Sequence, residues 1–369
     1  MNITHVVENL NRGGLERMVV DLVGMQQQQG HRCQVLCLFE RGTLAAELDA
    51  LGVPVHACGK RNGLDLRALA RLRHHVRSHA SQVMHTHNAM AQYLAVFATR
   101  GLGLRCVVNT RHGMGENRKS ARREWLYRRS LSATDAVVTV CRAARDAAVQ
   151  RGLAPEQKLR AIPNGIHVEA IARASAERRG RLREALGVAA ITRIIGTVGR
   201  LNWAKDQVSL VHAFGRVHAR CPEVALVLIG GGELLAELQQ AAKAAGIADA
   251  VYFLGDRDDV HDLLQGLDVF VLSSISEGYS MALLEACAAA LPIVATDVGG
   301  TAEIVRDGAT GRLVPARDVQ ALSDAVLFML RQPEQADAYG IAARAWVEQH
   351  GSLRTMAEQY QQLYHEMGA

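Results

Sequence analysis

The feature that most constrains the fold is a repeated alternation of short apolar runs with longer segments of helical spacing. Residues 3–7, 269–272 and 293–296 are four or five residues long and rich in β-branched side chains. Short apolar runs of this kind are typical of strands that are buried on both faces. Their alternation with helices predicts an α/β fold in which doubly wound parallel sheets carry helices on both faces.

The length of the chain predicts two domains, because 369 residues are too many for one simple core. We expect a first domain at residues 1–169 and a second at residues 185–347, joined by a polar stretch rich in alanine and arginine. A fresh buried strand at residues 193–199 begins the second domain. The last helix, within residues 351–369, has no strand of its own and is expected to cross back to the first domain.

The charge balance is mildly basic, with 42 lysines and arginines against 37 acidic residues and a net charge of +5. This balance suits an anionic ligand or an acidic membrane surface. It is too weak to indicate a nucleic-acid partner, and the chain has no zinc-finger or aromatic RNA-binding motif.

Seven scattered cysteines, with no Cys-x-x-Cys pair, are expected to be small buried hydrophobes in a reducing cytoplasm. The N-terminus lacks the basic start and apolar core of a signal peptide. No apolar run approaches the roughly 20 residues that span a bilayer. These features predict a cytoplasmic protein.

Two glutamates mark one strand-to-helix junction in the second half of the chain. Glu277 lies in the loop after the strand 269–272, and Glu285 lies just over a turn inside the next helix, for which Ser280 is the expected N-cap. The free N–H groups of a helix start form an anion site. Either glutamate alone is equally consistent with a cap or a solvated surface residue, but two carboxylates beside an anion site suit a nucleotide-sugar.

Two cations occupy another such loop. Arg200 and Lys205 follow the strand 193–199 and are five residues apart. Arginine binds phosphate in a bidentate way and lysine binds it as a point charge. The pair therefore indicates a diphosphate site, and two surface cations are the alternative.

Glycines follow two of the predicted strands. Gly14 ends the turn after residues 3–7, where the missing Cβ lets the backbone approach a phosphate, although a plain turn is the alternative. Gly231 lies in a glycine run after residues 224–229, where the backbone would pass close to a nucleotide. The Gly-x-Gly-x-x-Gly fingerprint of dinucleotide-binding proteins is absent.

His85, His87 and His112 lie at the carboxyl ends of predicted strands, where open α/β sheets bind ligands. A lone histidine at such a place is more often structural. Asn88 is the expected cap of the helix that runs to residue 98. No His-x-x-x-His or His/Asp cluster has the spacing of metal ligands, so we expect no bound metal.

The segment 116–129 is basic and contains Trp125, Leu126 and Tyr127. Such a segment is usually a solvated helix with a few core anchors. The alternative is a membrane-surface patch that recruits an anionic lipid-linked acceptor.

The string at residues 277–286, Glu-Gly-Tyr-Ser-Met-Ala-Leu-Leu-Glu-Ala, resembles the paired-glutamate signature of the retaining glycosyltransferases of family four. The loop Gly-Arg-Leu…Lys-Asp, the Thr-Arg-His-Gly string at 110–113 and the Pro-Asn-Gly-Ile string at 163–166 are similar to other motifs of that family. The likeness covers the whole chain and is nearest to members that build bacterial exopolysaccharide or other surface glycans. It implies the GT-B fold, with two Rossmann-like domains and an interdomain cleft.

The resemblance also implies roles for individual residues. Glu277, His112, Arg200 and Lys205 would be catalytic, with Glu277 and His112 near the donor sugar and the two cations on the diphosphate. Glu285 would hold the ribose. The implied donor-binding set is Gly14, Arg200, Lys205, Gly231, Arg257, Glu277, Gly278, Tyr279, Ser280, Met281 and Glu285. Of these, Arg257 would face the base.

The expected function is a metal-independent hexosyltransferase without a cofactor, peripheral to the inner face of the membrane. It would move a sugar with retention from a UDP- or GDP-sugar, held by the second domain, to a hydroxyl of a glycan or lipid-linked acceptor on the first. Same-face attack and a covalent intermediate both stay open. The alternatives are a GT-B epimerase or hydrolase of nucleotide-sugars, a nicotinamide-dependent dehydrogenase and a two-lobed sugar-binding protein.

Four positions depart from the family pattern. Asp206 stands where glycine is common, His167 where aspartate is common, Cys141 where serine is common and Ser280 where proline is common. None of these changes removes a charge from the donor site. They concern sugar choice and local loop shape.

Overall fold

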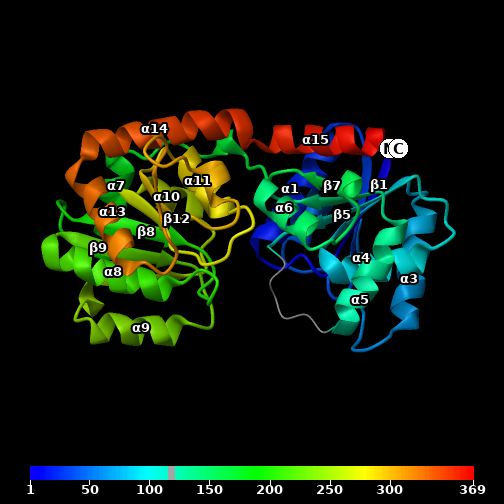
Figure 1. Cartoon of the computed structure of the whole chain (residues 1–369), viewed down its shortest axis with the longest axis horizontal. Coiled ribbons are helices and arrows are strands. Elements are labelled where there is room, and N and C mark those ends of the chain that lie inside the picture. The colour runs from blue at the N-terminus through cyan, green and yellow to red at the C-terminus, as the bar shows by residue number, and fades with distance from the viewer. Residues whose placement is uncertain (115–120) are drawn as a thin grey trace. The chain divides into compact units, whose positions relative to one another are not determined.

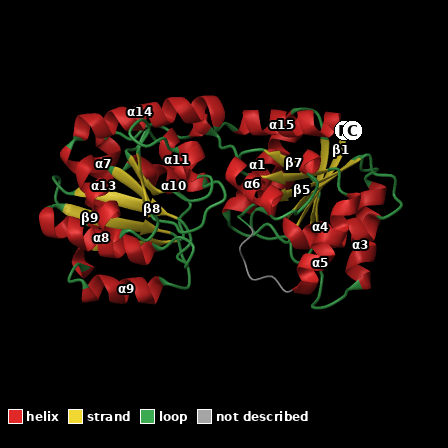
Figure 2. Cartoon of the chain, viewed as in Figure 1, coloured by secondary structure: helices red, strands yellow, loops and turns green. Residues whose placement is uncertain are grey.

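The computed structural model describes residues 1–114 and 121–369, and the chain divides into two compact units (Figure 1). Unit 1 is Met1–Ile166 with Leu353–Ala369, and unit 2 is His167–Ser352. Each unit has its own parallel sheet with helices on both faces (Figure 2). The two parallel-sheet α/β units confirm the predicted fold class.

The sheet of unit 1 has seven strands in the order β3-β2-β1-β4-β5-β6-β7. The strand order reverses between β1 and β4, and the crevice beside such a reversal is where open α/β sheets bind ligands. The strands are β1 (Asn2–Val7), β2 (Arg32–Cys37), β3 (Val55–Ala57), β4 (Val83–His87), β5 (Cys106–Arg111), β6 (Ala136–Thr139) and β7 (Leu159–Ala161).

Helices α3, α4 and α5 pack in a row on one face of this sheet, and α1 packs against α15 on the other. The last helix, α15, belongs to unit 1, and its Tyr360 and Tyr364 are fully buried there. The helices of unit 1 are α1 (Gly14–Gln28), α2 (Ala45–Ala50), α3 (Leu66–Ser78), α4 (Asn88–Thr99), α5 (Ala121–Ser130), η1 (Leu131–Ala133), α6 (Arg142–Gln150), η2 (Glu156–Lys158) and α15 (Leu353–Glu366).

The sheet of unit 2 has six strands in the order β10-β9-β8-β11-β12-β13, with the reversal between β8 and β11. The strands are β8 (Arg193–Val198), β9 (Val224–Ile229), β10 (Val251–Gly255), β11 (Val269–Leu272), β12 (Ile293–Thr296) and β13 (Arg312–Val314). The bounds of β11 and β12 are those predicted from their apolar runs.

Helix α8 packs on α9 and α13, whereas α11 packs on α14 and α7 on α10. None of the described helices combines the length and the apolar character that a membrane span needs. The helices of unit 2 are η3 (Val168–Ala170), α7 (Ala176–Leu186), α8 (Gln207–Arg220), α9 (Leu235–Ala244), η4 (Ala248–Ala250), α10 (Val260–Gln265), α11 (Met281–Ala288), α12 (Thr301–Ile304), α13 (Val319–Arg331) and α14 (Pro333–His350).

The predicted cap at Asn88 is wrong. Helix α4 begins at Asn88 itself, which has a φ of 66°, and His87 holds the cap position without a side-chain cap bond. The Oδ1 of Asn88 instead accepts a hydrogen bond from the backbone N–H of His112 (3.2 Å). Asparagine tolerates this left-handed backbone better than most residues do, so the turn ties the ends of β4 and β5 together.

The cysteines behave as predicted from their apolar surroundings. All seven are free thiols, and all except Cys221 are buried. Burial raises the pKa of Cys33, Cys106 and Cys287 to about 12, so these thiols stay protonated at neutral pH. Protonated thiols are poor nucleophiles, which indicates a packing role.

Helix α7, which lies mostly in the polar stretch expected to join the two domains, is anchored in unit 2 by a buried carboxylate. Asp268, which is 5% exposed, accepts hydrogen bonds from the Arg183 guanidinium of α7 and from the backbone N–H of Ile194 in β8, both at 2.7 Å. Arg183 also donates to the carbonyl of Thr192 (2.6 Å). The Asp268–Arg183 pair therefore links α7 to β8 and to the start of β11 through one buried carboxylate.

We expect Asp268→Ala to lower the free energy of unfolding of unit 2 by about 3–5 kcal/mol, because it leaves the buried Arg183 without its counter-charge. Urea denaturation measures the change. The control is Asp324→Ala, which removes the half-exposed partner of Arg220 and should change stability by less than about 1 kcal/mol. Equal effects of the two substitutions would contradict the anchoring role.

Candidate functional site

The loops after β8 and β11 form the centre of the candidate site in unit 2, where the strand order reverses. They are hydrogen-bonded to each other, from the N–H of Ile275 to the carbonyl of Ala204 (2.9 Å) and from the Ser273 hydroxyl to the carbonyl of Lys205 (2.9 Å). Because these bonds hold the two loops together, side chains from both loops meet at one edge of the sheet.

Lys205 and Glu277 are the predicted site residues that this edge brings into contact. The Lys205 ammonium forms an ion pair with Oε1 of Glu277, and the Ser274 hydroxyl donates to the same oxygen (2.7 Å). Their side chains are 21% and 10% exposed, so the pair is largely shielded from water. An anionic ligand at Lys205 would compete with Glu277 for the ammonium group.

Arg200 is exposed, and within the described residues its guanidinium has no hydrogen-bond or ion-pair partner. Its backbone carbonyl accepts from the Gln207 side chain (3.0 Å), which closes the loop. Asp206 in this loop has a φ of 48°, a region that glycine enters without strain, and it caps α8 by accepting from the N–H of Ser209 (3.4 Å). The cap offsets some of the backbone strain at a position where glycine was expected.

The glycine run after β9 has a structural cause. A Cβ at Gly230 would lie 2.3 Å from the carbonyl oxygen of Gly199, and one at Gly232 would lie 2.3 Å from that of Leu201. Gly231 accepts from the N–H of Leu201 (2.9 Å). The run is thus needed for close packing against the Arg200 loop, and it brings Gly231 beside that loop.

The start of α11 has the predicted geometry. Ser280 caps the helix by accepting from the N–H of Leu283 (3.4 Å), which confirms the expected cap. Tyr279 is buried, and Gly278 accepts from the N–H of Gly300 (3.0 Å), so the turn before the helix is fixed. The first N–H groups of the helix, from Met281 onward, have no intrahelical acceptor.

Glu285 and Arg257 have polar neighbours of their own. His261 Nε2 lies 3.6 Å from Oε1 of Glu285, whose side chain is 19% exposed. Arg257 is exposed and makes a two-pronged contact with Asp259, at 2.8 and 2.6 Å. A base at Arg257 would therefore meet an arginine that is already paired.

Gly14 and His112 lie at the carboxyl edge of the sheet of unit 1. Gly14 is exposed and is the first residue of α1, next to the extended cap Gly13. His112 follows the last residue of β5, and Asn88 holds its backbone N–H. Nδ1 of His112 is buried and has no hydrogen-bond partner within the described part of the chain.

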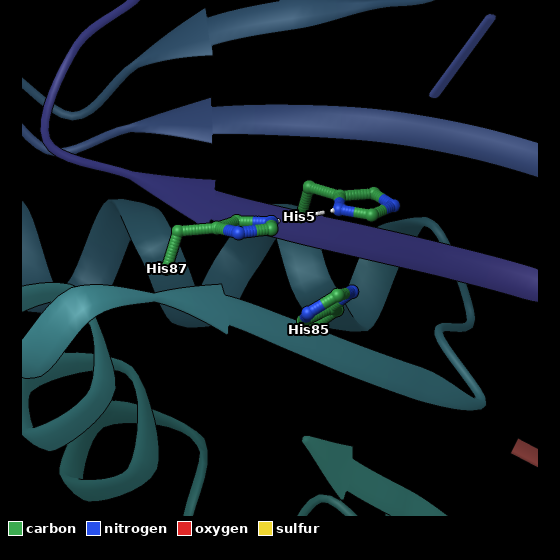
Figure 3. A group of neighbouring side chains, drawn as sticks. All are labelled: His5, His85 and His87. Carbon is green, nitrogen blue, oxygen red and sulfur yellow. Dashed lines mark hydrogen bonds between the residues drawn. The ribbon is translucent and has the colours of Figure 1, made fainter. Parts of the chain in front are cut away.

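Three further histidines, His5, His85 and His87, lie side by side on β1 and β4 of unit 1 (Figure 3). His87 Nδ1 is 3.0 Å from His112 Nε2, and His5 Nδ1 is 3.1 Å from His87 Nε2. His5 Nε2 bonds Oε1 of the buried Gln26 (2.8 Å). His85 lies beside them, with its two ring nitrogens bonded to the Tyr364 and Thr110 hydroxyls, both at 2.7 Å.

The sequence motifs considered for metal ligands do not include this cluster, in which nitrogens of His5, His85 and His87 all lie within 4.8 Å of one another. The sequence did not reveal it because β1 and β4, far apart in the chain, are neighbours that pair His5 with His85. Every ring nitrogen of the three already has a hydrogen-bond partner, and the group contains no anionic ligand. A buried divalent charge would lack compensation, so we assign a hydrogen-bonded network.

Burial keeps these imidazoles neutral. It lowers the pKa of His5 to about 4 and that of His112 to about 3, and it lowers the pKa of His85 and His87 well below the usual value. Loss of hydration disfavours the charged form of each ring. A neutral histidine donates from one nitrogen and accepts at the other.

A pocket of about 260 Å³ in unit 1 was also missed by sequence reasoning. Arg111, Arg128 and Arg151 line it together with Glu124, so its charged side chains are mostly cationic. It lies at the ends of β5 and β6, and the basic character of the neighbouring segment was its only sequence signal. Residues 116–120 of that segment lie outside the described residues.

Comparison with known proteins gives matches along nearly the whole chain. The family model "Glycosyltransferase Family 4" matches residues 12–170, and "Glycosyl transferases group 1" matches residues 179–346. The chain is 30% identical over 312 residues to EpsD of Bacillus subtilis (strain 168), which is named as a candidate glycosyltransferase, covering 81% of each chain. It is 27% identical over 272 residues to the UDP-Gal:alpha-D-GlcNAc-diphosphoundecaprenol alpha-1,3-galactosyltransferase of Escherichia coli, covering 71% of this chain and 70% of the relative.

A solved structure has the same fold. Anabaena Alr3699/HepE in complex with UDP-glucose superimposes with a TM-score of 0.87 at 21% identity, covering 99% of each chain. Together with the two parallel sheets of seven and six strands, this likeness identifies the fold as GT-B.

The neutral histidines predict acid destabilisation of unit 1. Above about pH 6.5 the rings are neutral in both states and contribute nothing to the pH dependence. Below it, the unfolded chain binds protons that the folded chain does not, so the free energy of unfolding falls by about 1.4 kcal/mol per pH unit for each ring. For His5 this loss continues down to about pH 4.

His5→Asn should therefore reduce this slope by about 1.4 kcal/mol per pH unit between pH 6 and 4.5. Urea denaturation at several pH values, with unit 1 followed by hydrogen exchange in β1 and β4, measures it. The exposed His74 provides the matched control, and His74→Asn should leave the slope unchanged. An unchanged slope in His5→Asn would mean that His5 is not buried and neutral.

Proposed function

Because the chain belongs to glycosyltransferase family four, we propose that it transfers a hexosyl group, with retention, from a UDP-sugar or GDP-sugar to a hydroxyl of a glycan or lipid-linked acceptor. The donor contacts are assigned to unit 2 and the acceptor contacts to unit 1. The printed names of a UDP-Gal-dependent relative and of a fold neighbour bound to UDP-glucose favour a UDP-sugar. Retention of the anomeric configuration is proposed because retention is general in this family.

The observation that carries the proposal is the Lys205–Glu277 ion pair, together with Arg200 of the same loop, whose guanidinium has no partner among the residues that the structure describes. The donor diphosphate takes over Lys205, and Arg200 binds the same group in a bidentate way. Glu277, released from the ammonium, accepts hydrogen bonds from the hydroxyls of the sugar. Binding of the diphosphate is thereby linked to presentation of the carboxylate that holds the sugar.

The same groups stabilise the leaving diphosphate as negative charge grows on it. Arg200, Lys205 and the N–H groups of Met281 and Ala282 at the start of α11 are preorganised before the reaction, and electrostatic stabilisation of this kind is usually the largest catalytic contribution. These residues carry the charge without a metal ion.

The remaining donor contacts follow from position and from the family pattern. Glu285, inside the first turns of α11, holds the ribose hydroxyls. Gly231 and Arg257, after β9 and β10, lie toward the base. Gly14 lets the start of α1 approach a phosphate, and His112 contacts the sugar.

The acceptor is proposed to be anionic. The pocket with three arginines at the ends of β5 and β6 suits a phosphate group, and the Escherichia coli relative has a diphosphoundecaprenol acceptor in its printed name. Helix α5 adjoins this region with an exposed Trp125 (63% exposed) among the arginines 122, 123 and 129. This surface is proposed to rest on the inner face of the membrane.

The function is tested by a thermal-shift screen of UDP- and GDP-sugars, because a ligand that binds the native state raises its stability. Transfer with the donor so identified should continue in EDTA and give a product with the anomeric configuration of the donor. Inversion, complete loss in EDTA, or donor hydrolysis that no acceptor suppresses would contradict the proposal.

Glu285→Ala should weaken donor binding by one to two orders of magnitude, because a hydrogen bond to a charged group contributes about 1.5–3 kcal/mol.

Arg200→Ala and Lys205→Ala should lower kcat more than they raise KM, because diphosphate charge grows in the transition state. The exposed Glu237 of α9 supplies a matched control, Glu237→Ala, which should bind the donor as the wild type does. Wild-type turnover in both cation variants would refute the clamp.

The membrane contact predicts binding to vesicles of anionic lipid that weakens with salt, because exposed charges are screened within about 10 Å at 0.1 M ionic strength. Trp125→Ala combined with Arg122→Ala and Arg129→Ala should abolish co-sedimentation. Ile341→Ala removes an apolar side chain that is 57% exposed on α14, and it should have no effect. Equal binding by the triple variant and the wild type would leave α5 as an ordinary solvated helix.

A further inference from the structure

An unbroken line of hydrogen bonds runs from the interior of unit 1 to His112. Gln26 on α1 is 1% exposed and bonds His5 on β1; His5 bonds His87 at the end of β4, and His87 bonds His112 after β5. Each link lies between 2.8 and 3.1 Å. The line ends at Nδ1 of His112, which is buried and has no partner within the described residues.

The order of protons along this line follows from its first link. Oε1 of Gln26 only accepts, so His5 must donate from Nε2 and, being neutral, must accept at Nδ1. His87 then donates from Nε2 to His5 and accepts at Nδ1. His112 in turn donates from Nε2 to His87, which leaves its own Nδ1 without a proton.

A second branch holds the Gln26 amide in this orientation. Its Nε2 donates to the Tyr364 hydroxyl (3.3 Å), which lies 2.7 Å from His85 Nδ1. Because burial raises the pKa of Tyr364, its hydroxyl keeps a proton to donate to His85. His85 then donates from Nε2 to the Thr110 hydroxyl (2.7 Å). One amide therefore sets the direction of both branches.

We propose that Gln26, acting through His5 and His87, fixes His112 in the tautomer that carries its proton on Nε2, so that the bare Nδ1 accepts a hydrogen bond from a hydroxyl of the bound sugar. Gln26, His5 and His87 are positioning residues, because they act on the sugar only through His112. The role of the sugar hydroxyl rests on the proposed function, whereas the tautomer does not.

The arrangement has a chemical consequence for binding. The opposite proton order would leave two acceptors facing each other at the Gln26–His5 link, and it would place an N–H at Nδ1 of His112 and make that atom a donor. A fixed acceptor selects a ligand group that carries a proton, such as a sugar hydroxyl, over a phosphate oxygen. The bond from the backbone N–H of His112 to Asn88 fixes the backbone of His112 at the end of β5.

The test is long-range ¹H–¹⁵N NMR of histidine-labelled protein near pH 7.5, which distinguishes a bare ring nitrogen from an N–H. The chain has 15 histidines, and the spectrum of His112→Asn identifies the signals of His112 by their absence. We expect a single tautomer with a bare Nδ1. An N–H at Nδ1, or fast exchange between two tautomers in the wild type, would overturn the proposal without any other variant.

Gln26→Met removes the amide at similar volume, and it should let the other tautomer of His112 become populated. Gln34→Met is the matched control, because Gln34 is also a buried glutamine of unit 1 but donates to the Thr4 hydroxyl (2.8 Å) and the backbone carbonyl of His75 (3.2 Å), and not to a histidine of the line. It should leave His112 unchanged. His5→Phe, which keeps a ring but interrupts the line, is the second variant if Gln26→Met does not fold. An unaltered His112 tautomer in the folded variant would overturn the proposal.

Kinetics separate this inference from the proposed function. Gln26→Met should lower kcat/KM for sugar transfer about 2- to 10-fold, the range for one neutral hydrogen bond, and Gln34→Met should not. A wild type that transfers no sugar would refute the proposed function and leave the NMR result standing. One equivalent of tightly bound zinc in the purified protein would overturn the inference, because the metal would occupy the ring nitrogens that the line requires.

Discussion

The parallel direction of all strands within each sheet is the constraint on which both sites depend. It brings the carboxyl ends of neighbouring strands to one edge, where loops meet that are far apart in the chain. In unit 2 this edge joins the loops after β8 and β11 and pairs Lys205 with Glu277. In unit 1 it places His87 beside β5 and the following His112. Each site is therefore a consequence of strand order at the reversal point.

The parts of the fold that local pattern determines were predictable. Continuous apolar runs defined β11 and β12 to the residue, and a serine before an apolar helix marked the cap of α11. What depends on strand order was not predictable, because no local signal pairs His5 with His85. Asn88 shows a third case: its usual preference for a cap gave way to a left-handed turn that serves the neighbouring loop. The donor-site assignments stay predictions based on motif and on the geometry of single loops.

The two units differ in the charge of the side chains at the edge of their sheets. Unit 2 pairs a lysine with a glutamate at a place partly shielded from water, so an anionic ligand would have only to displace one partner from the other. Unit 1 instead removes charge from its histidines by burying them, which lowers the pKa of each ring. A site for a leaving group that gains charge needs fixed cations. In the proposed function unit 1 meets a neutral sugar, for which directional donors and acceptors are more suitable than charged groups that would attract the diphosphate.

Neutrality alone would not fix the proton of His112 on one ring nitrogen, because an isolated neutral imidazole interconverts between two tautomers. To fix the tautomer, a neighbour must be unable to exchange its donor for its acceptor. The buried Gln26 amide meets this need, because its oxygen and its nitrogen are both hydrogen-bonded. His5 and His87 lie between Gln26 and His112, and each donates from one nitrogen and accepts at the other. The same donor-to-acceptor order therefore continues from the interior to the edge of the sheet. A serine or threonine hydroxyl can also donate to one neighbour and accept from another, but it does so through a single oxygen, whereas each imidazole carries two nitrogens on different sides of the ring, and each of them reaches one neighbour. The second nitrogen of each ring is thus what makes histidine, and not serine or threonine, the fitting residue at positions 5 and 87.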